Sequence, residues 1–406
     1  MQLDSTSASA ERSRLLTTHQ WDVLVVGAGP AGLSAARLLA AERLSVLVLE
    51  EHEQIGSPVH CTGVLGLEAF AELDLPRETI STITRTARFH GAHGRSIRVD
   101  GGEVAAAVVD RGHFDRVLAE RASAAGATIL RGARVSALDV AGRVTARVTV
   151  GDRDHAVSAR VCVLACGAHY RFNRQLGLGI PRAYLQSAQL EMPFPRVEDV
   201  EIDLDRGLAP RGFAWIVPFT RGGIDMARVG LMASDTVAAR FKAYARRLGE
   251  RHGTALGDSA PRLKILPLAP VKRTYADRVV AVGDAAGLAK PTTGGGIYYS
   301  LLSGRYAAEV LTSALRQDRT DASTLKAYET LWQGRIGPEL RAGLAFRTLV
   351  ARFDDRAIDA LLELAAVDGI VPLLRQTANF NWHRAAALAL LKNSGFRRIV
   401  LSSLWT

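Results

Sequence analysis

One pattern near the N-terminus constrains the fold of this chain more than any other. An apolar run ending at Val26 leads into three glycines in G-x-G-x-x-G spacing, namely Gly27, Gly29 and Gly32, and a second apolar run ends at Glu50. A strand, glycine turn, helix and second strand with a terminal acid form the dinucleotide-binding pattern. Gly32 permits close packing of helix and strand, and the other two glycines admit a pyrophosphate. Glu50 can accept hydrogen bonds from both ribose hydroxyls of an adenosine, which favours FAD or NAD over NADP.

A second glycine-rich segment follows roughly 250 residues later. The apolar run 279–282 leads into Gly283 and Asp284, and after a Pro-Thr-Thr turn three glycines precede a predicted helix. A carboxylate at a strand end can accept hydrogen bonds from a sugar-like hydroxyl, and the N–H groups at a helix start favour an electron-rich ligand. A tight strand-to-helix turn without a ligand would use similar residues. The match to the upstream pattern favours a single nucleotide site divided between two parts of the chain.

Composition is consistent with a large enzyme. The chain has 406 residues, 48% of them hydrophobic, and a formal net charge of +10. Its three cysteines, Cys61, Cys162 and Cys166, include no C-x-x-C pair, so neither a disulfide framework nor a metal site is indicated and a reducing cytoplasm is expected. No signal peptide and no apolar run of ~20 residues is recognisable. Nothing in the sequence resembles a nucleic-acid-binding module.

The order of predicted elements suggests two domains and an appendage. We expect an FAD-binding domain over 20–181 and 276–321, a substrate domain over 182–275, and a helical C-terminal region over 322–406. Strand-like runs near 83–109 are expected to join the substrate sheet. Within 182–275 the pattern predicts strands and hairpins with one helix near 236–251, whereas apolar residues at spacings of three and four predict helices from about 322 onward.

Three further motifs accompany the divided nucleotide pattern. They are Gly56-Ser-Pro-Val-His-Cys61-Thr-Gly63, Val109-Asp-Arg111-x-x-Phe114-Asp115 and Phe213-x-Trp215-x-Val217-Pro218. Together, over about residues 20–320, they resemble the geranylgeranyl reductase family, within the p-hydroxybenzoate-hydroxylase group of FAD proteins. The resemblance implies an α/β fold: a glutathione-reductase-like, Rossmann-type FAD-binding domain, an inserted antiparallel β-sheet substrate domain and a helical C-terminal region. The family usually has Tyr and Phe where this chain has Phe213 and Val217, which affects the substrate more than the cofactor.

The resemblance also assigns roles to individual residues. It implies FAD contacts at Gly27, Gly29, Ala31, Gly32, Glu50, Cys61, Thr62, Gly63, Arg111, Val135, Gly283, Asp284, Gly295, Gly296 and Ile297. It implies substrate contacts at Phe213, Trp215 and Pro218. Cys61 is the candidate catalytic residue, through substrate placement or proton relay, although a cysteine is also an ordinary buried hydrophobe. Arg111 could instead only pair with Asp115, and Trp215 could be a core residue of a strand.

The activity implied is FAD-dependent reduction of carbon–carbon double bonds in an isoprenoid, geranylgeranyl-type lipid or diphosphate. NADPH or reduced ferredoxin would be a transient electron donor, because only one nucleotide pattern is present. The alternative is an FAD-dependent monooxygenase, a hydroxylase or epoxidase, of a hydrophobic substrate. A flavin-bound protein without turnover is a third possibility. Flavin halogenases share the fold and need a lysine near the flavin in the N-terminal half, but this chain has no lysine before Lys242.

The C-terminal stretch has a distinctive charge pattern. From Arg375 to the end there are five basic residues and no acidic ones, interleaved with apolar residues such as Phe396, Leu404 and Trp405. A basic amphipathic segment suits an anionic membrane surface. A helical cap with a solvated face fits the same pattern. A cytoplasmic protein with possible peripheral membrane association is therefore expected.

Overall fold

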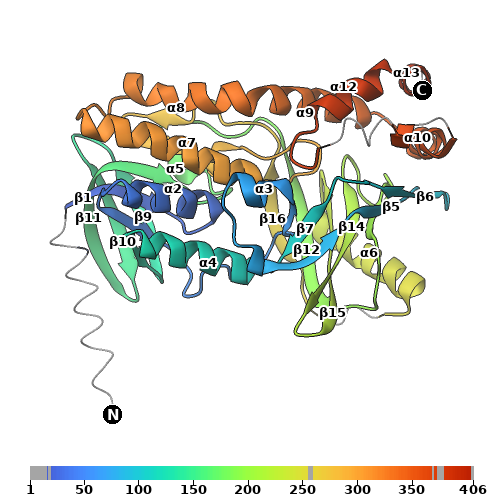
Figure 1. Cartoon of the computed structure of the whole chain (residues 1–406), viewed down its shortest axis with the longest axis horizontal. Coiled ribbons are helices and arrows are strands. Elements are labelled where there is room, and N and C mark those ends of the chain that lie inside the picture. The colour runs from blue at the N-terminus through green and yellow to red at the C-terminus, as the bar shows by residue number, and fades with distance from the viewer. Residues whose placement is uncertain (1–15, 17–19, 255–258, 368–369, 373–378, 404–406) are drawn as a thin grey trace, which may run out of the picture.

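The structure, a computed structural model, describes residues 16, 20–254, 259–367, 370–372 and 379–403. Figure 1 shows a sheet with flanking helices on one side of the molecule and a second sheet with helix α6 on the other, with the C-terminal helices running over both. After the roles expected for them, we call the part with the sheet that contains β1 and β11 the cofactor unit. We call the part with the sheet that contains β12 and β14 the substrate unit. The predicted α/β class is confirmed.

The cofactor unit is built on an eight-stranded sheet whose main path runs β17-β18-β11-β1-β2-β8. The strands of this path are β17 (Tyr275–Ala276), β18 (Val279–Ala281), β11 (Arg153–Leu164), β1 (Gln20–Val26), β2 (Val46–Leu49) and β8 (Thr128–Leu130). From β18 to β8 the pairing is parallel. The remaining strands, β9 (Ala133–Asp139) and β10 (Val144–Val150), form an antiparallel extension from the first half of β11. The parallel strands are rich in valine and leucine because both of their faces are covered.

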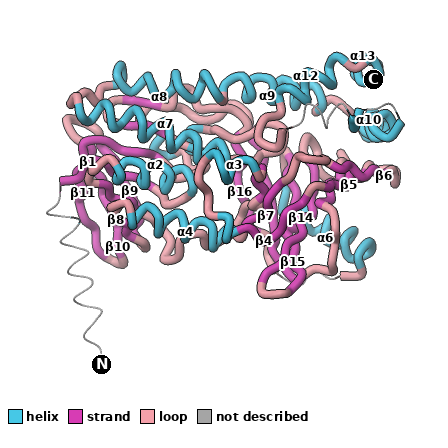
Figure 2. The backbone as a smooth tube through the Cα atoms, in the orientation of Figure 1, coloured by secondary structure: helices cyan, strands magenta, loops and turns pink. Residues whose placement is uncertain are grey.

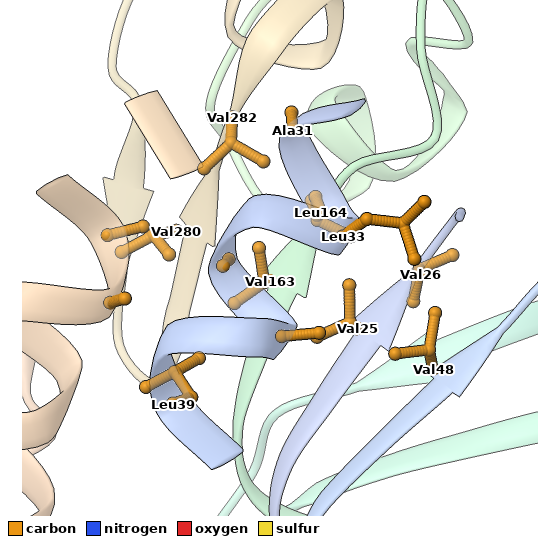
Figure 3. Close-up of a cluster of buried hydrophobic side chains, with 14 of the residues drawn as sticks. Val25, Val26, Ala31, Leu33, Leu39, Val48, Val163, Leu164, Val280 and Val282 are labelled. Atoms are coloured by element: carbon orange, nitrogen blue, oxygen red, sulfur yellow. The ribbon is translucent and has the colours of Figure 1, made fainter. Parts of the chain in front are cut away.

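Helices α2 (Pro30–Ala41), α4 (Arg111–Ala124) and α7 (Ile297–Arg316) pack beside this sheet. Figure 3 shows Leu33 and Leu39 of α2 among buried valines of the parallel strands, such as Val25 and Val163. The same buried cluster extends into α7, whose residues are almost all inaccessible to solvent over its first two turns. Each glycine-rich segment leads into one of these two helices, α2 or α7, which pack against each other. The packing therefore fixes the relative positions of the two segments.

The substrate unit has a seven-stranded sheet in the order β16-β12-β15-β14-β13-β5-β6. Its strands are β16 (Arg262–Pro267), β12 (Tyr184–Pro193), β15 (Ile224–Ala233), β14 (Phe213–Arg221), β13 (Val200–Asp203), β5 (Thr86–His90) and β6 (Ser96–Asp100). All neighbours pair antiparallel except β13 and β5, which are parallel. Helix α6 (Val237–His252), predicted near 236–251, packs against β12 and β15.

The segment 80–109 divides between two sheets. Strands β5 and β6 lie in the seven-stranded sheet, whereas β4 (Ile80–Thr84) and β7 (Ala106–Val109) pair with β3 (Val64–Gly66) in a separate three-stranded sheet. Arg85 separates β4 from β5, and β4 and β7 lie outside the seven-stranded sheet that the runs near 83–109 were expected to join. The three-stranded sheet lies between the two units, and β4 packs against β14.

The described part of the C-terminal region is mostly helical, as predicted (Figure 2). Its helices are α8 (Ala322–Arg335), α9 (Gly337–Val350), α10 (Asp355–Val367), α12 (Arg384–Lys392) and α13 (Ser394–Ser402). Phe396 of α13 is buried between α9 and α10, where it stacks on Phe346 with 6.1 Å between ring centroids. Within the described ranges, the structure contains no helix with the length and apolar character that crossing a membrane requires.

Candidate functional site

A cavity of about 970 Å³ lies where the two units meet. Its wall combines the glycine turn after β1, the loop that contains Cys61, the start of β9 and residues of β12 and β16. The volume is at the upper end of the range of ~300–1,000 Å³ typical of ligand pockets. The cavity lies beyond the carboxyl ends of the parallel strands, the usual ligand position in such sheets.

The glycine turn allows very close backbone approach. A Cβ atom at Gly27, whose φ is +106°, would lie 2.5 Å from the carbonyl oxygen of Ala165, and one at Gly32 would lie 2.2 Å from the carbonyl oxygen of Gly27. Neither position can therefore accept a side chain. A Cβ atom at Gly29 would have no neighbour within 4 Å, and Gly27, Gly29 and Ala31 face the cavity. Gly32 lies behind the wall and has the packing role predicted for it.

Glu50 closes one side of the same turn. Its carboxylate, 13% exposed, accepts hydrogen bonds from the backbone N–H groups of Ala28 at 2.8 Å and His52 at 3.0 Å. A carboxylate has about four acceptor positions, so Glu50 can accept ribose hydroxyls as well. Val135, in β9, also lies in the cavity wall, next to Ala133.

The second glycine segment supplies Asp284 to the cavity wall. Helix α7 begins after Gly296, and a Cβ atom at Gly296 would lie 3.0 Å from Oδ1 of Asp284. Four predicted residues of this segment, Gly283, Gly295, Gly296 and Ile297, do not line the cavity. Gly283 lies behind Asp284, and its N–H donates to the Ser303 hydroxyl at 2.9 Å. The structure therefore brings the two glycine segments to one cavity through Asp284 and the turn after β1.

Cys61 and Arg111 also face the cavity, whereas Thr62 and Gly63 do not. Arg111 does pair with Asp115, donating to the carboxylate at 2.7 and 2.9 Å, so the pairing and the cavity position coexist. Burial raises the pKa of Asp115, and the charge of Arg111 opposes that shift. Burial acts to lower the pKa of Arg111. The pairing with Asp115 outweighs this effect, so the pKa of Arg111 is raised and the guanidinium stays charged. The buried Nε of Arg111 has no hydrogen-bond partner within the described residues.

The predicted substrate residues lie elsewhere. Phe213, Trp215 and Pro218 are in β14 and do not line the cavity. Phe213 and Trp215 make an edge-to-face contact with 5.9 Å between ring centroids, and Trp215 is packed across Gly230 within an apolar cluster that includes Met232. This cluster nevertheless borders the second glycine segment, because a Cβ atom at Gly294 would lie 3.1 Å from Leu266 and 3.9 Å from Met232.

Sequence reasoning missed several polar residues of the site. Lys264, from β16, lines the cavity and pairs with Asp284 at 3.0 Å. The N-terminal half of the chain has no lysine, yet the cavity contains an ammonium group, which Lys264 supplies. Tyr170 donates its hydroxyl to the backbone oxygen of Asp284 at 2.9 Å. Burial lowers the pKa of His60 to about 4, and the charges of Lys264 and Arg111 add to the shift.

Arg228 is the other missed residue. Its side chain is fully buried and donates to the backbone oxygens of Thr62 and Val109, at 2.7 and 2.9 Å, and to Glu191 at 2.9 Å. It thereby holds the loop that presents Cys61. The signal that could have identified Arg228 is its charge, because the residues around it in 227–233 are apolar. The sequence does not indicate which distant residues it contacts.

The residues of the cavity fit an FAD. The glycine turn leaves room for a pyrophosphate, Glu50 and Asp284 offer carboxylates to two sets of sugar hydroxyls, and Arg111 presents an unpaired buried N–H. Residues 22–352 match the protein family described as lycopene cyclase protein. A digeranylgeranylglycerophospholipid reductase of Methanopyrus kandleri is 32% identical over 88% of this chain and 93% of its own length.

Solved structures agree with this assignment. A geranylgeranyl bacteriochlorophyll reductase-like protein of Thermoplasma acidophilum has a TM-score of 0.81 and 26% identity, covering 95% of this chain and 98% of its own. A flavin-dependent brominase, at 16% identity and a TM-score of 0.67 over 95% of this chain and 98% of its own, shares the fold. The chain belongs to the geranylgeranyl reductase family of FAD-dependent oxidoreductases.

Proposed function

We propose that this protein saturates carbon–carbon double bonds of an isoprenoid chain carried on a glycerophospholipid. The observation that supports the proposal best is the cavity itself, where both glycine segments and Cys61 meet beside an apolar cluster of the substrate unit. Relatives named digeranylgeranylglycerophospholipid reductase support the substrate class. Reduced FAD supplies hydride in such reactions, and a proton is needed at the second alkene carbon.

The chain's own residues would bind and orient the two reactants. A polyprenyl tail has few hydrogen-bonding groups, so burial at ~0.8 kcal/mol per CH₂ must supply most of its affinity. We expect the tail to approach along the cluster of Trp215, Met232 and Leu266, where the cluster borders Gly294. Phe213 and Pro218 would then shape that apolar surface from β14. NADPH or reduced ferredoxin is the proposed electron donor.

The decisive experiment is anaerobic incubation of dithionite-reduced protein with digeranylgeranylglycerophospholipid, followed by mass spectrometry of the lipid. We expect successive mass gains of two hydrogens. Oxygen consumption that depends on the lipid, with gain of an oxygen atom and no anaerobic turnover, would identify the monooxygenase instead. No change of the lipid under either condition would contradict both activities.

Cys61→Ser should separate chemistry from cofactor binding. Cys61 is half-buried in the cavity wall, and its Sγ lies 3.5 Å from the Gly63 N–H. If the thiol places the alkene or relays a proton, lipid reduction should slow by about 100-fold, the low end of general acid–base effects. Flavin reduction and FAD affinity should stay near wild type. Cys166→Ser is the matched control, since Cys166 is a second thiol of the same wall. Full activity in the Cys61 variant would leave Cys61 a packing residue.

We also propose that α12 and α13 contact an anionic membrane surface. They expose Leu388, Leu391 and Leu401 together with basic residues and no acidic ones, and Phe396 anchors α13 to the body of the protein. Leu404 and Trp405 lie outside the described residues. Each Lys or Arg near such a surface contributes ~1 kcal/mol.

Neutralising Lys392, Arg397 and Arg398 to glutamine should therefore weaken binding to phosphatidylserine vesicles by about 100-fold at low salt. The control replaces Arg43, Arg77 and Arg147, which are exposed on the cofactor unit. Sedimentation with vesicles measures both triple variants. Equal vesicle binding by the two triple variants would contradict the proposed membrane contact, and so would a wild-type protein that does not bind vesicles.

A further inference from the structure

Lys264 occupies an unusual position for a lysine. It lies in β16, which pairs with β12 at the edge of the substrate sheet, yet its side chain lines the cavity of the cofactor unit. Figure 1 shows β16 at the junction of the two units. Only 26% of the side chain is exposed, although its neighbours Leu263 and Ile265 are both exposed. The strand therefore presents one charged group inward at the point where the units meet.

The partner of Lys264 is Asp284 of the second glycine segment. Its Nζ lies 3.0 Å from Oδ2 of Asp284, while Oδ1 of the same carboxylate faces Gly296 at the start of α7. This carboxylate is the one predicted to accept a hydroxyl of the cofactor. An ammonium has three N–H donors, so pairing with Asp284 leaves Lys264 able to donate to a bound ligand. Attraction to Asp284 raises the pKa of Lys264 and keeps it charged.

The two buried arginines near the cavity, Arg111 and Arg228, are held by protein partners. Arg111 pairs with Asp115 through both carboxylate oxygens, and Arg228 is held by Glu191 and two backbone oxygens. Among the described residues, Lys264 forms its ion pair with Asp284 alone, and it also faces the cavity. It also lies on the same side as the α7 N-terminus, whose dipole favours negative charge. Two sources of positive potential thus converge beside Asp284.

We propose that Lys264 is an electrostatic partner of the bound flavin that favours its reduced form. Two-electron reduction increases negative charge on the flavin ring system, and a fixed ammonium in a partly desolvated wall stabilises that charge more than the neutral oxidised ring. Lys264 would thereby raise the midpoint potential of bound FAD and ease acceptance of electrons from a donor. The inference rests on the FAD assignment but not on the identity of the lipid.

A purely structural role predicts something different. If Lys264 only ties β16 to Asp284, its loss should weaken oxidised and reduced FAD equally and leave the potential unchanged. The test therefore compares the affinity of the apoprotein for oxidised and for dithionite-reduced FAD, measured anaerobically by fluorescence titration. The midpoint potential of bound FAD is measured by titration with redox dyes, in the wild-type protein and in the variants named below.

For Lys264→Gln we expect affinity for reduced FAD to fall at least about tenfold more than affinity for oxidised FAD. Each tenfold difference corresponds to a potential about 30 mV more negative. Lys264→Arg should restore most of the wild-type potential. Arg262→Gln is the matched control, because Arg262 is on the same face of β16 but does not line the cavity. This variant should keep the wild-type potential.

Equal loss of both affinities in Lys264→Gln would overturn the proposal and leave Lys264 a structural tie. An equal potential shift in Arg262→Gln would also overturn it, since the effect would then be a general charge effect. Excess FAD keeps the comparison measurable if binding is weak. Wild-type protein that binds neither form of FAD would instead contradict the FAD assignment. Failure of the wild-type protein to reduce the lipid, together with the expected potential shift in Lys264→Gln, would contradict only the proposed activity and support the role of Lys264.

Discussion

Glu50→Arg should remove FAD from the protein. The carboxylate that accepts from Ala28 N–H at 2.8 Å is placed to accept both ribose hydroxyls of the adenosine, and arginine has no acceptor. Hydrogen bonds to a charged group are worth ~1.5–3 kcal/mol each. Losing two of them lowers FAD affinity by about 100-fold or more, at 1.4 kcal/mol per factor of ten. Absorbance of the purified protein near 450 nm and fluorescence titration of the apoprotein measure the effect.

Glu53→Arg is the control for this variant. Glu53 is exposed three residues further on and does not line the cavity, so the same charge reversal should leave FAD affinity within a few-fold of wild type. Circular dichroism of both variants checks that they fold. If Glu50→Arg retained its flavin, Glu50 would be only a surface acid that supports the glycine turn.

Local patterns predicted the part of the site that depends on local backbone geometry. Gly32 tolerates no Cβ atom because of its contact with Gly27 in the same strand–turn–helix unit, and that unit is readable from spacing alone. The contact that excludes a Cβ atom at Gly27 comes instead from Ala165, just after β11. The position of Asp284 shortly after β18 was likewise predictable from the local sequence. These residues converge because parallel strands of one sheet end at one edge. Their contacts with FAD remain predictions.

Long-range pairs were not predictable. Lys264 and Arg228 meet partners 20 and 37 or more residues away, which only the folded sheet brings together. Trp215 was expected either at the substrate or in the core of a strand, and its side chain packs in an apolar cluster outside the cavity wall. Aromatic residues in strands are ordinary core residues, so the motif alone could not place its side chain.

Strand β13 shows the same limit within the substrate sheet. It carries two acids at alternate positions, Glu201 and Asp203, and both are buried. They persist because Arg251 and Tyr244 of α6 reach across to them; Tyr244 donates to Asp203 at 2.9 Å. Buried carboxylates need such partners, and the partners come from a helix about 40 residues later in the chain.

Arg228→Met should be the most destabilising substitution of a single charged residue at the junction of the units. Arg228 is fully buried, it donates to Thr62 and Val109, and its guanidinium lies 4.4 Å from the ring centroid of Phe219. Methionine fills similar space but leaves both carbonyls without this donor. Breaking a buried ionic pair costs ~3–5 kcal/mol. The free energy of unfolding of the apoprotein, from urea titration, should fall by about that amount.

Arg221→Met gives the matched comparison, because Arg221 also pairs with Glu191 but is 40% exposed. An exposed pair is worth about 0–1 kcal/mol, so this variant should stay close to wild type. A second readout follows from the backbone contacts: without Arg228 the loop at Thr62 loosens, and native-state alkylation of Cys61 by iodoacetamide should accelerate, while the rate at Cys166 stays unchanged. Equal stability losses in the two arginine variants would mean that Glu191, and not the buried backbone contacts, determines the effect. An unchanged Cys61 rate would show that Gly63 and its own turn hold the loop without Arg228.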